Sequence, residues 1–378
     1  MKIVFVSNFL NHHQLSVCLQ FTEGNDFRFI ATMPTPKAQV SLGYDDMNEV
    51  YDFVIKAYES HALKELAQRK IDTADVVIAG SCAFPFEMIE KRLKEDKLTF
   101  WFSERLFKHS PLMRFYPPTV KRVLSQCTAY KANENFYLLA AGAYTAADYH
   151  YFQAFCGKSF KWGYFPANSD SSPEVIRQQK QKNTKLTLLW AGRFLPLKHP
   201  DYALYASHIL TKAGIEHEVY MLGEGSLFDP IKQKAAKTGG GRIFLQGATP
   251  FRQVRNYMNA ADIFLFTSDR REGWGAVLNE SMDSACAVLA NKQIGAAPYL
   301  ITHGRNGIMY GSKRQFAEEL LLLARDPRKR RDLGEAALAE IRGAWSAKTA
   351  AKNFLQIAEK LLGGCHNVAC DVGPMSKT

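Results

Sequence analysis

Short apolar runs alternate with amphipathic stretches along the first part of the chain. Each run is rich in apolar residues and bounded by polar ones, as expected for strands of a parallel sheet that is buried on both faces. Such strands are predicted at residues 2–6, 27–33, 51–57, 76–80 and 98–102. Helical periodicity between them is found at residues 15–21, 62–69 and 85–94. This alternation predicts an α/β fold with a parallel, doubly wound sheet.

A second series of the same kind follows a polar segment at residues 167–185, which we interpret as a linker. Its strands are predicted at residues 186–191, 218–222, 242–246, 263–266 and 287–290. We therefore expect two Rossmann-like domains that face a cleft, residues 1–166 and 186–342. A last helix is expected at residues 343–362, and a flexible tail at 363–378.

Residues 262–286 carry the most informative pattern. The apolar strand Ile263 to Phe266 is followed by a polar turn, then by Gly273 and Gly275, and then by a helical pattern. Glycines allow close approach of the backbone to a ligand, and a helix that begins in such a loop favours an anion. The carboxylates of Glu272 and Glu280 flank this position and can accept hydrogen bonds from hydroxyls. A phosphate between two sets of sugar hydroxyls describes a nucleotide sugar.

Two acids seven residues apart are commonly solvated surface residues, but the whole arrangement is more specific. It resembles the nucleotide-sugar motif of retaining GT-B glycosyltransferases of family 4, the glycosyl transferases group 1. The resemblance implies that Glu272 holds the donor sugar and that Glu280 holds the ribose. It also implies that the last helix crosses back to the first domain. The donor phosphates would meet the backbone of Gly273, Trp274, Gly275, Ala276 and Val277.

A pair of cations follows the strand that ends at Ala191. Arg193 offers a rigid fork of donors and Lys198 a mobile point charge, and both suit a diphosphate. An isolated Arg and Lys would more often be solvated loop residues. Here Gly192, Arg193 and Lys198 match the Gly-Arg-x-x-x-x-Lys motif of the same family, in which the two cations stabilise the leaving nucleoside diphosphate. The resemblance therefore implies the catalytic set Glu272, Arg193 and Lys198.

Three further glycines stand in turns after predicted strands, Gly223 and Gly225 in one turn and Gly247 in the next. A single Gly-x-Gly is weak evidence for a ligand, and a plain turn is the alternative. The resemblance adds these glycines to the donor-binding set, since the family has turns near the nucleotide at these places.

No metal or cofactor is expected. A metal-dependent glycosyltransferase would offer an Asp-x-Asp pair to hold a divalent cation, and no two Asp residues stand two apart in this sequence. Arg193 and Lys198 can neutralise the diphosphate instead, which predicts a metal-independent reaction. The first predicted strand is not followed by Gly-x-Gly-x-x-Gly, which excludes the dinucleotide fingerprint of dehydrogenases.

The first domain departs from the family pattern. Residues 8–13 replace the glycine loop that many members have after the first strand, and Ser103 and Glu104 stand where many have a histidine. The resemblance assigns the acceptor side to the first domain and the nucleotide sugar to the second, and each acceptor-side candidate also has a structural interpretation. The candidates for acceptor contacts are Asn8, His12, His13, Glu104 and His109.

The chain has a formal charge of +11, which calls for an anionic partner. Residues 105–133 hold six Lys or Arg and no acid, interleaved with large apolar residues. An anionic membrane surface is therefore a candidate partner, with core aromatics and solvated cations as the alternative. No nucleic-acid motif is found, and nucleic acid is not expected.

The chain contains seven scattered Cys, an odd number, and it has no apolar run near the ~20 residues of a membrane span. These two features predict a cytoplasmic protein, with the inner face of the cell membrane as a candidate location.

The resemblance, together with the basic and aromatic stretch at residues 105–133, implies a retaining glycosyltransferase that moves a sugar from a nucleotide-diphosphate sugar to a glycan or lipid-linked acceptor, in a surface polysaccharide pathway. Two alternatives stay open. A nucleotide-sugar 2-epimerase of the same architecture would need no acceptor, and a non-catalytic assembly subunit would need no intact donor site.

Overall fold

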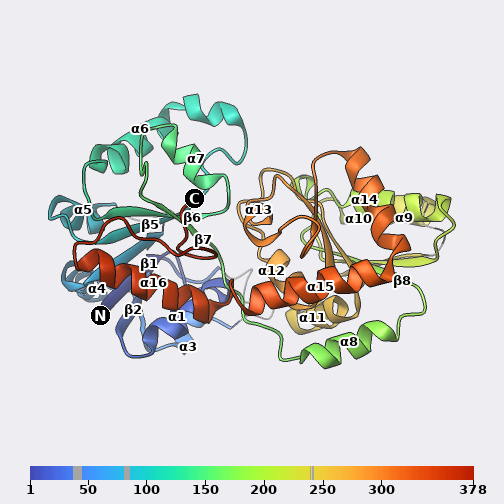
Figure 1. Cartoon of the computed structure of the whole chain (residues 1–378). Coiled ribbons are helices and arrows are strands. Elements are labelled where there is room, and N and C mark those ends of the chain that lie inside the picture. The colour runs from blue at the N-terminus through green and yellow to red at the C-terminus, as the bar shows by residue number, and fades with distance from the viewer. Residues whose placement is uncertain (37–44, 81–85, 239, 241) are drawn as a thin grey trace. The chain divides into compact units, whose positions relative to one another are not determined.

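The computed structural model describes residues 1–36, 45–80, 86–238, 240 and 242–378. The chain forms two compact units. The first unit is Met1–Ala167 together with Ala344–Thr378, and the second is Asn168–Gly343 (Figure 1). Each contains a parallel sheet of the predicted doubly wound kind with helices packed around it, so the predicted architecture is confirmed.

The sheet of the first unit has seven strands within the described residues, in the order β3-β2-β1-β4-β5-β6-β7. Its strands are β1 Lys2–Ser7, β2 Asp26–Ala31, β3 Val54–Lys56, β4 Val76–Gly80, β5 Thr99–Glu104, β6 Phe136–Ala141 and β7 Ser159–Trp162. Its helices are α1 His12–Thr22, α3 Met47–Val50, α4 His61–Thr73, α5 Glu87–Lys94, η1 Pro111–Phe115, α6 Pro117–Gln126, η2 Thr128–Tyr130, α7 Thr145–His150 and α16 Ala347–Leu362.

The central strands of this sheet are buried along most of their length, since helices cover both faces. All residues of β4 and β6 are buried, which explains why these segments read as continuous apolar runs. From β1 the chain first builds the sheet toward β3 and then returns to add β4 on the other side of β1. The carboxyl ends of β1 and β4 therefore form a topological switch point, where ligands commonly bind.

Helix α16 belongs to the first unit although it ends the chain's regular structure, and Figure 1 shows it beside α1. Its fully buried Phe354 packs with ring centroids 5.2 Å from Phe21, 4.9 Å from Phe100 and 5.8 Å from Trp162. The apolar side of α16 thus completes the core of the first unit.

The predicted flexible tail at residues 363–378 is instead packed. Lys377 pairs with Phe160 in an antiparallel bridge, and the amide of Lys161 donates to the carbonyl of Ser376 at 2.8 Å. Met375 is completely buried. The tail lies along β7, an edge strand whose unpaired backbone groups it satisfies. Its Gly, Pro and Ser content indicated flexibility, but edge pairing decides the structure.

The second unit has six parallel strands, counted over its described residues, in the order β10-β9-β8-β11-β12-β13. The strands are β8 Leu186–Ala191, β9 His217–Leu222, β10 Ile243–Gly247, β11 Ile263–Phe266, β12 Ala287–Asn291 and β13 Ile308–Tyr310. The helices are α8 Pro173–Gln181, η3 Pro196–Lys198, α9 Asp201–Lys212, α10 Phe228–Thr238, α11 Phe251–Ala260, α12 Val277–Asp283, α13 Ala297–Leu300, α14 Lys313–Arg325 and α15 Pro327–Arg342.

The segment predicted as a linker, residues 167–185, contains helix α8, and from Asn168 onward it belongs to the second unit. Ser172 caps this helix by accepting a hydrogen bond from the amide of Val175 at 3.3 Å, and Pro173 opens the first turn. Its buried Ile176 contributes the apolar contact that holds the helix against the unit. The polar composition that indicated a linker is the solvated face of this helix.

Candidate active site

The strand order of the second unit reverses between β8 and β11. From β8 the chain first adds β9 and β10 on one side, and it later returns to place β11 on the other side. The loops that leave the carboxyl ends of these two central strands meet at this switch point. They carry the two pieces of sequence that predicted the donor site, residues 192–199 and 267–277.

Lys198 and Glu272 meet across these two loops. Lys198 Nζ donates to Glu272 Oε2, and each side chain is 15% exposed. The Thr267 hydroxyl fixes the loop of Lys198 because it donates to the carbonyl of Lys198 at 2.6 Å. The indole of Trp190, at the end of β8, donates to the same hydroxyl at 2.9 Å. Two residues that the sequence analysis singled out separately thus form one partly buried ion pair.

Arg193 lies in the same loop with its side chain exposed. It makes no ion pair with any residue that the structure describes. The backbone of the next residue, Phe194, is anchored, because its amide donates to the carbonyl of Glu224 at 2.8 Å. The guanidinium therefore stands on a fixed backbone and is available to an anion at this edge.

The predicted glycines bring three loops into close contact at the same edge. Gly223 has a φ of +117°, and a Cβ there would lie 2.2 Å from the carbonyl oxygen of Gly192. Gly225 is equally confined, since a Cβ would lie 2.6 Å from the carbonyl oxygen of Phe194. The Gly223 amide donates to the carbonyl of Gly247 at 2.8 Å. The space between these loops therefore requires glycine at two positions.

The loop between β11 and α12 contains a charged cluster that the sequence analysis missed. Arg271 binds Asp269 with three side-chain contacts of 2.7 to 3.1 Å, and His199 Nε2 lies 3.1 Å from Asp269 Oδ2. Burial raises the pKa of the Asp269 carboxyl, but hydrogen bonds from Arg271 and His199 outweigh burial and hold this pKa below its usual value. Asp269 thereby links the two loops beside Glu272. In the sequence, the position of Asp269 three residues before Glu272 is the signal that could have identified it as part of the site.

Gly273, Trp274, Gly275, Ala276 and Val277 form the turn into α12. Gly275 has a φ of +90°, and a Cβ there would lie 2.4 Å from the ring of Phe266. Trp274 is buried, and its indole donates to Asn279 Oδ1 at 2.9 Å. Ala276 and Val277 are half-buried at the start of α12. The turn is therefore held by its buried tryptophan while the backbone that follows stays accessible.

Glu280 lies in the middle of α12 and is buried. Burial, partly opposed by Arg255 and reinforced by Asp283, raises the pKa of this carboxyl above its usual value. A buried carboxyl with a perturbed pKa at a strand-loop-helix turn is typical of a functional position.

Asp283, one turn after Glu280, is a structural centre that sequence reasoning missed. Arg342 of α15 donates to Asp283 Oδ1 at 2.8 Å, and Arg255 of α11 donates to Asp283 Oδ2 at 3.3 Å. The amide of Ser169 also donates to Asp283. Because Asp283 is 1% exposed and fully partnered, it fixes α12 and therefore the position of Glu280.

The first unit has a polar cavity of about 370 Å³ at the carboxyl ends of β1, β4 and β5. Asn8 and Glu104, two of the predicted acceptor candidates, line it. Glu104 accepts a hydrogen bond from Lys108, and Arg122 completes a basic wall. From the sequence, Arg122 was predicted only as one of the basic residues of the candidate membrane surface at 105–133, because nothing in its local sequence shows that α6 faces this cavity.

The three histidine candidates do not line this cavity. His12 and His13 form the first turn of α1, which Asn11 caps by accepting from the His13 amide at 3.0 Å. They were expected in a loop, but the Asn11 cap starts the helix earlier. Burial lowers the pKa of His12 to about 4. His109 is exposed in a turn after β5, outside the cavity lining.

In the described part of the chain, no helix is long and apolar enough to cross a membrane. The two doubly wound sheets, with cationic and acidic loops at a switch point, define the chain as having the GT-B glycosyltransferase fold. Residues 171–339 match the family model "Glycosyl transferases group 1". The matched residues make up most of the second unit, which is therefore similar to the glycosyltransferase domains of this family.

Two curated relatives support the family. An uncharacterised glycosyltransferase of Methanocaldococcus jannaschii is 28% identical over 149 residues, 39% of this chain and 40% of the relative. A GDP-mannose-dependent monoacylated alpha-(1-6)-phosphatidylinositol monomannoside mannosyltransferase of Corynebacterium glutamicum is 25% identical over 188 residues, 48% of this chain and 49% of the relative. The chain thus spans about half or less of the length of the curated relatives that it matches.

Solved structures of similar fold cover nearly the whole chain. Anabaena HepE in complex with UDP has a TM-score of 0.68 at 16% identity, covering 96% of this chain and 100% of that one. A glycosyltransferase of Rickettsia africae has a TM-score of 0.67 at 15% identity, covering 95% and 98%. At such identities the likeness concerns the fold.

Proposed function

We propose that this protein is a retaining, metal-independent glycosyltransferase that moves a sugar from a nucleotide-diphosphate sugar to a glycan or lipid-linked acceptor. One observation carries the proposal: Lys198 and Glu272 contact each other at the switch point of a glycosyl transferases group 1 domain. A cation for the diphosphate and a carboxylate for the sugar stand side by side, as transfer from a nucleotide sugar requires.

The two cations have the role of stabilising the leaving group. Lys198 is held by its anchored loop, and Arg193 is exposed on the same loop. Negative charge grows on the diphosphate as the bond to the sugar breaks, and cations placed in advance stabilise that charge more than they stabilise the bound donor. These two residues replace a divalent metal, which is why the proposed reaction needs none.

The two carboxylates have separate roles in the proposal. Glu272, beside Lys198, accepts hydrogen bonds from hydroxyls of the donor sugar when the donor phosphate takes up the charge of Lys198. Glu280, fixed by the Asp283 cluster, accepts hydrogen bonds from the ribose hydroxyls. Loop amides between Gly273 and Val277 contact the phosphates. We assign no second carboxylate as nucleophile.

The acceptor contacts the polar cavity of the first unit, where Asn8, Glu104 and Arg122 offer both hydrogen-bond acceptors and positive charge. The similar mannosyltransferase of Corynebacterium glutamicum acts on a phosphatidylinositol mannoside, a lipid-linked acceptor. This similarity supports a lipid-linked or glycan acceptor in a surface polysaccharide pathway.

The proposal is tested by incubating the protein with UDP-, GDP- and ADP-sugars in EDTA, with and without a membrane extract as the source of acceptor. We expect one donor to release nucleoside diphosphate faster with the extract, and NMR to show a product with the anomeric configuration of the donor. Release of a free epimeric nucleotide sugar without extract would show a 2-epimerase instead. No reaction with any donor would contradict catalysis.

We further propose that the first unit binds anionic membranes through the surface of η1 and α6. Leu112 and Phe115 are 69% and 60% exposed, and Tyr116 and Leu124 are exposed beside them. Arg114 and Lys121 lie on the same two helices, and these six residues form the membrane patch. Basic residues near anionic lipid contribute ~1 kcal/mol each, and exposed apolar side chains add interfacial burial.

Phe107 and Arg105, which lie within residues 105–133, are not included in the proposed membrane patch. Phe107 is buried in the core, and Arg105 faces Asp148 at 3.7 Å. Co-sedimentation with anionic liposomes should therefore fall when Phe115 and Leu124 are both changed to Ser. The same change at Leu322, an exposed leucine of α14, should have no effect. Equal binding of both variants, or no binding by the wild type at low salt, would exclude this surface.

A further inference from the structure

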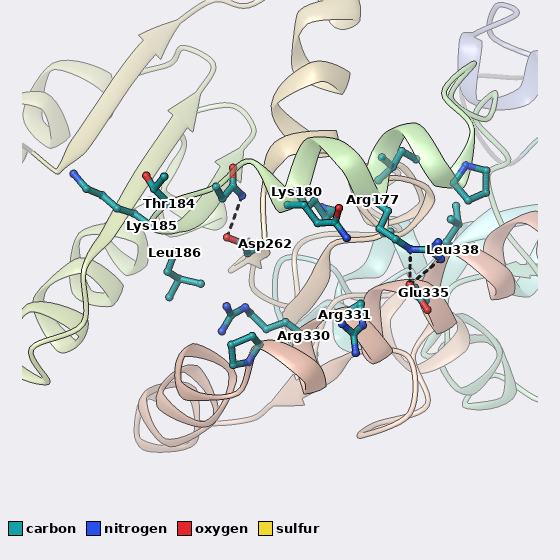
Figure 2. Close-up of a pocket in the computed structure, with 16 residues that line it drawn as sticks. Arg177, Lys180, Thr184, Lys185, Leu186, Asp262, Arg330, Arg331, Glu335 and Leu338 are labelled. Atoms are coloured by element: carbon teal, nitrogen blue, oxygen red, sulfur yellow. Dashed lines mark hydrogen bonds and ion pairs between the residues drawn. The ribbon is translucent and has the colours of Figure 1, made fainter.

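We propose that a cavity between α8 and α15 of the second unit binds a phosphate monoester with a sugar-like body. The cavity measures about 420 Å³ and opens at the amino ends of β8 and β11, where Leu186 begins one strand and Asp262 precedes the other (Figure 2). The donor loops leave the opposite ends of these strands, about 16 Å away along β8 at ~3.3 Å per residue. The cavity is thus separate from the proposed donor site, and the inference does not rest on the transferase activity.

Among the described residues that line the cavity, five are basic and two are acidic, and Figure 2 shows them on α8, on α15 and at the strand ends. The basic residues are Arg177, Lys180, Lys185, Arg330 and Arg331. Both acids are already engaged. Glu335 accepts from Arg177 at 3.1 Å, and Asp262 accepts from the Thr187 amide at 2.8 Å and from Asn183 at 3.2 Å. Three of the five cations have a carboxylate nearby, since Arg177 lies 3.0 Å from Glu335, and Lys185 and Arg331 each lie 3.8 Å from an acid, Glu218 and Asp332 respectively. Lys180 and Arg330 are the lining cations that form no ion pair within the described residues.

Arg330 is the strongest indication of an anionic ligand. Its Nη1 donates to the carbonyls of Leu323 and Ala324 at 2.7 and 2.9 Å, which fixes the guanidinium. Its Nε and Nη2 groups form the edge that binds carboxylate or phosphate in a bidentate manner, and this edge has no acidic partner within the described part of the chain. Burial lowers the pKa of this arginine, and the carboxylates of Asp262 and Asp326 partly oppose that effect.

The rest of the lining selects the body of the ligand. The apolar members are the aliphatic residues Ile176, Leu186 and Leu338, with alanine and proline, and no aromatic ring lines the cavity in the described chain. A nucleobase would therefore find no stacking partner. Gln181 and Thr184 offer hydrogen bonds to hydroxyls. Lys180 and Arg330, two lining cations that form no ion pair within the described residues, favour a dianionic phosphate over a single carboxylate. A sugar phosphate satisfies all three features.

The test is a calorimetric titration of the full chain with glucose 1-phosphate, with inorganic phosphate and UMP as parallel probes. We expect saturable binding of glucose 1-phosphate, weaker binding of phosphate alone, and no gain from the base of UMP. Saturating UDP and the Lys198→Ala variant should leave this binding unchanged, because both act at the opposite sheet edge. Displacement by UDP, or loss in Lys198→Ala, would assign the ligand to the donor site and overturn the inference.

Variants locate the binding within the cavity. Arg330→Gln should weaken glucose 1-phosphate at least ~10-fold, as expected for the loss of a charge-assisted bidentate contact. Arg331→Gln, which removes a more exposed cation of the same lining, should weaken it in the same direction without affecting folding. Arg328→Gln is the matched control, since Arg328 is on α15 but outside the lining. No saturable binding up to roughly 10 mM, or equal loss in the control, would refute the proposal.

Discussion

The contact between Lys198 and Glu272 predicts that the two residues stabilise the ligand-free protein as a pair. Each side chain is 15% exposed, so the pair is neither a solvated surface pair nor a fully buried one. Lys198→Ala would leave a largely buried carboxylate without its cation. Glu272→Gln would leave a largely buried cation without its carboxylate. The double variant removes both charges and should therefore lose less stability than the sum of the two single changes.

The burial of the pair sets the magnitude of this coupling. Exposed pairs contribute ~0.2–1 kcal/mol, whereas breaking a fully buried pair costs ~3–5 kcal/mol. At 15% exposure we expect a coupling of ~1–2 kcal/mol. The second unit comprises residues 168–343, that is, 176 residues. For a domain of this size 1 kcal/mol shifts Tm by ~2–4 °C, so the coupling corresponds to roughly 2–8 °C.

The assay is thermal and urea unfolding of the wild type, both single variants and the double variant. The nucleoside diphosphate that binds most tightly is then added at saturation. It should reduce the coupling, because the phosphate shares the charge of Lys198. Additivity of the single changes within ~0.3–0.5 kcal/mol would show that the two residues do not interact in solution, and the reasoning would fail.

Three further changes test other parts of the site. Glu280→Gln should mainly raise the KM for the donor, since the amide accepts hydrogen bonds from ribose less well, and steady-state kinetics would show a fall in kcat alone if the role is misassigned. Gly223→Ala should destabilise the fold by more than ~1 kcal/mol, because its Cβ would lie 2.2 Å from the Gly192 carbonyl oxygen, and an unchanged urea midpoint would contradict the close approach of these loops. Asp269→Asn should cost ~1–2 kcal/mol at pH 7. Because the pKa of Asp269 is lowered in the folded state, the stability that this carboxylate contributes should be present above ~3.9, its pKa in the unfolded state, and should be lost as pH falls through the lower folded pKa. A difference in unfolding free energy between the variant and the wild type that persists at low pH would contradict this prediction.

Local pattern was sufficient to predict the alternation of strands and helices. The strand at Ile263–Phe266 has the bounds that its apolar run indicated. Helix α8 was missed although its capping signals, Ser172 and Pro173, are visible in the sequence. The long polar run after them weighed more in the interpretation than the caps did. The packed tail could not be predicted locally, because its order comes from pairing with β7.

The candidate site was predictable in its parts rather than in its contacts. The sequence shows Lys198 and Glu272 as members of two motifs, but 74 residues separate them and only the sheet order brings them together. Asp283 carries no local signal, since its partners Arg255 and Arg342 come from two other helices. Long-range ion pairs depend on tertiary packing, which residue spacing in one sequence does not encode.

The central claim is that the carboxyl edge of the second sheet binds a nucleoside diphosphate without metal. It is tested most directly by calorimetric titration of UDP and GDP, in EDTA, into the wild type, Lys198→Ala and the control Lys212→Ala, in which an exposed lysine at the end of α9 is removed. We expect one nucleotide to bind the wild type and the control equally and to bind Lys198→Ala at least ~10-fold more weakly, since a charge-assisted contact to phosphate is lost. Binding that requires added Mn²⁺, or that is unchanged in Lys198→Ala, would contradict the account.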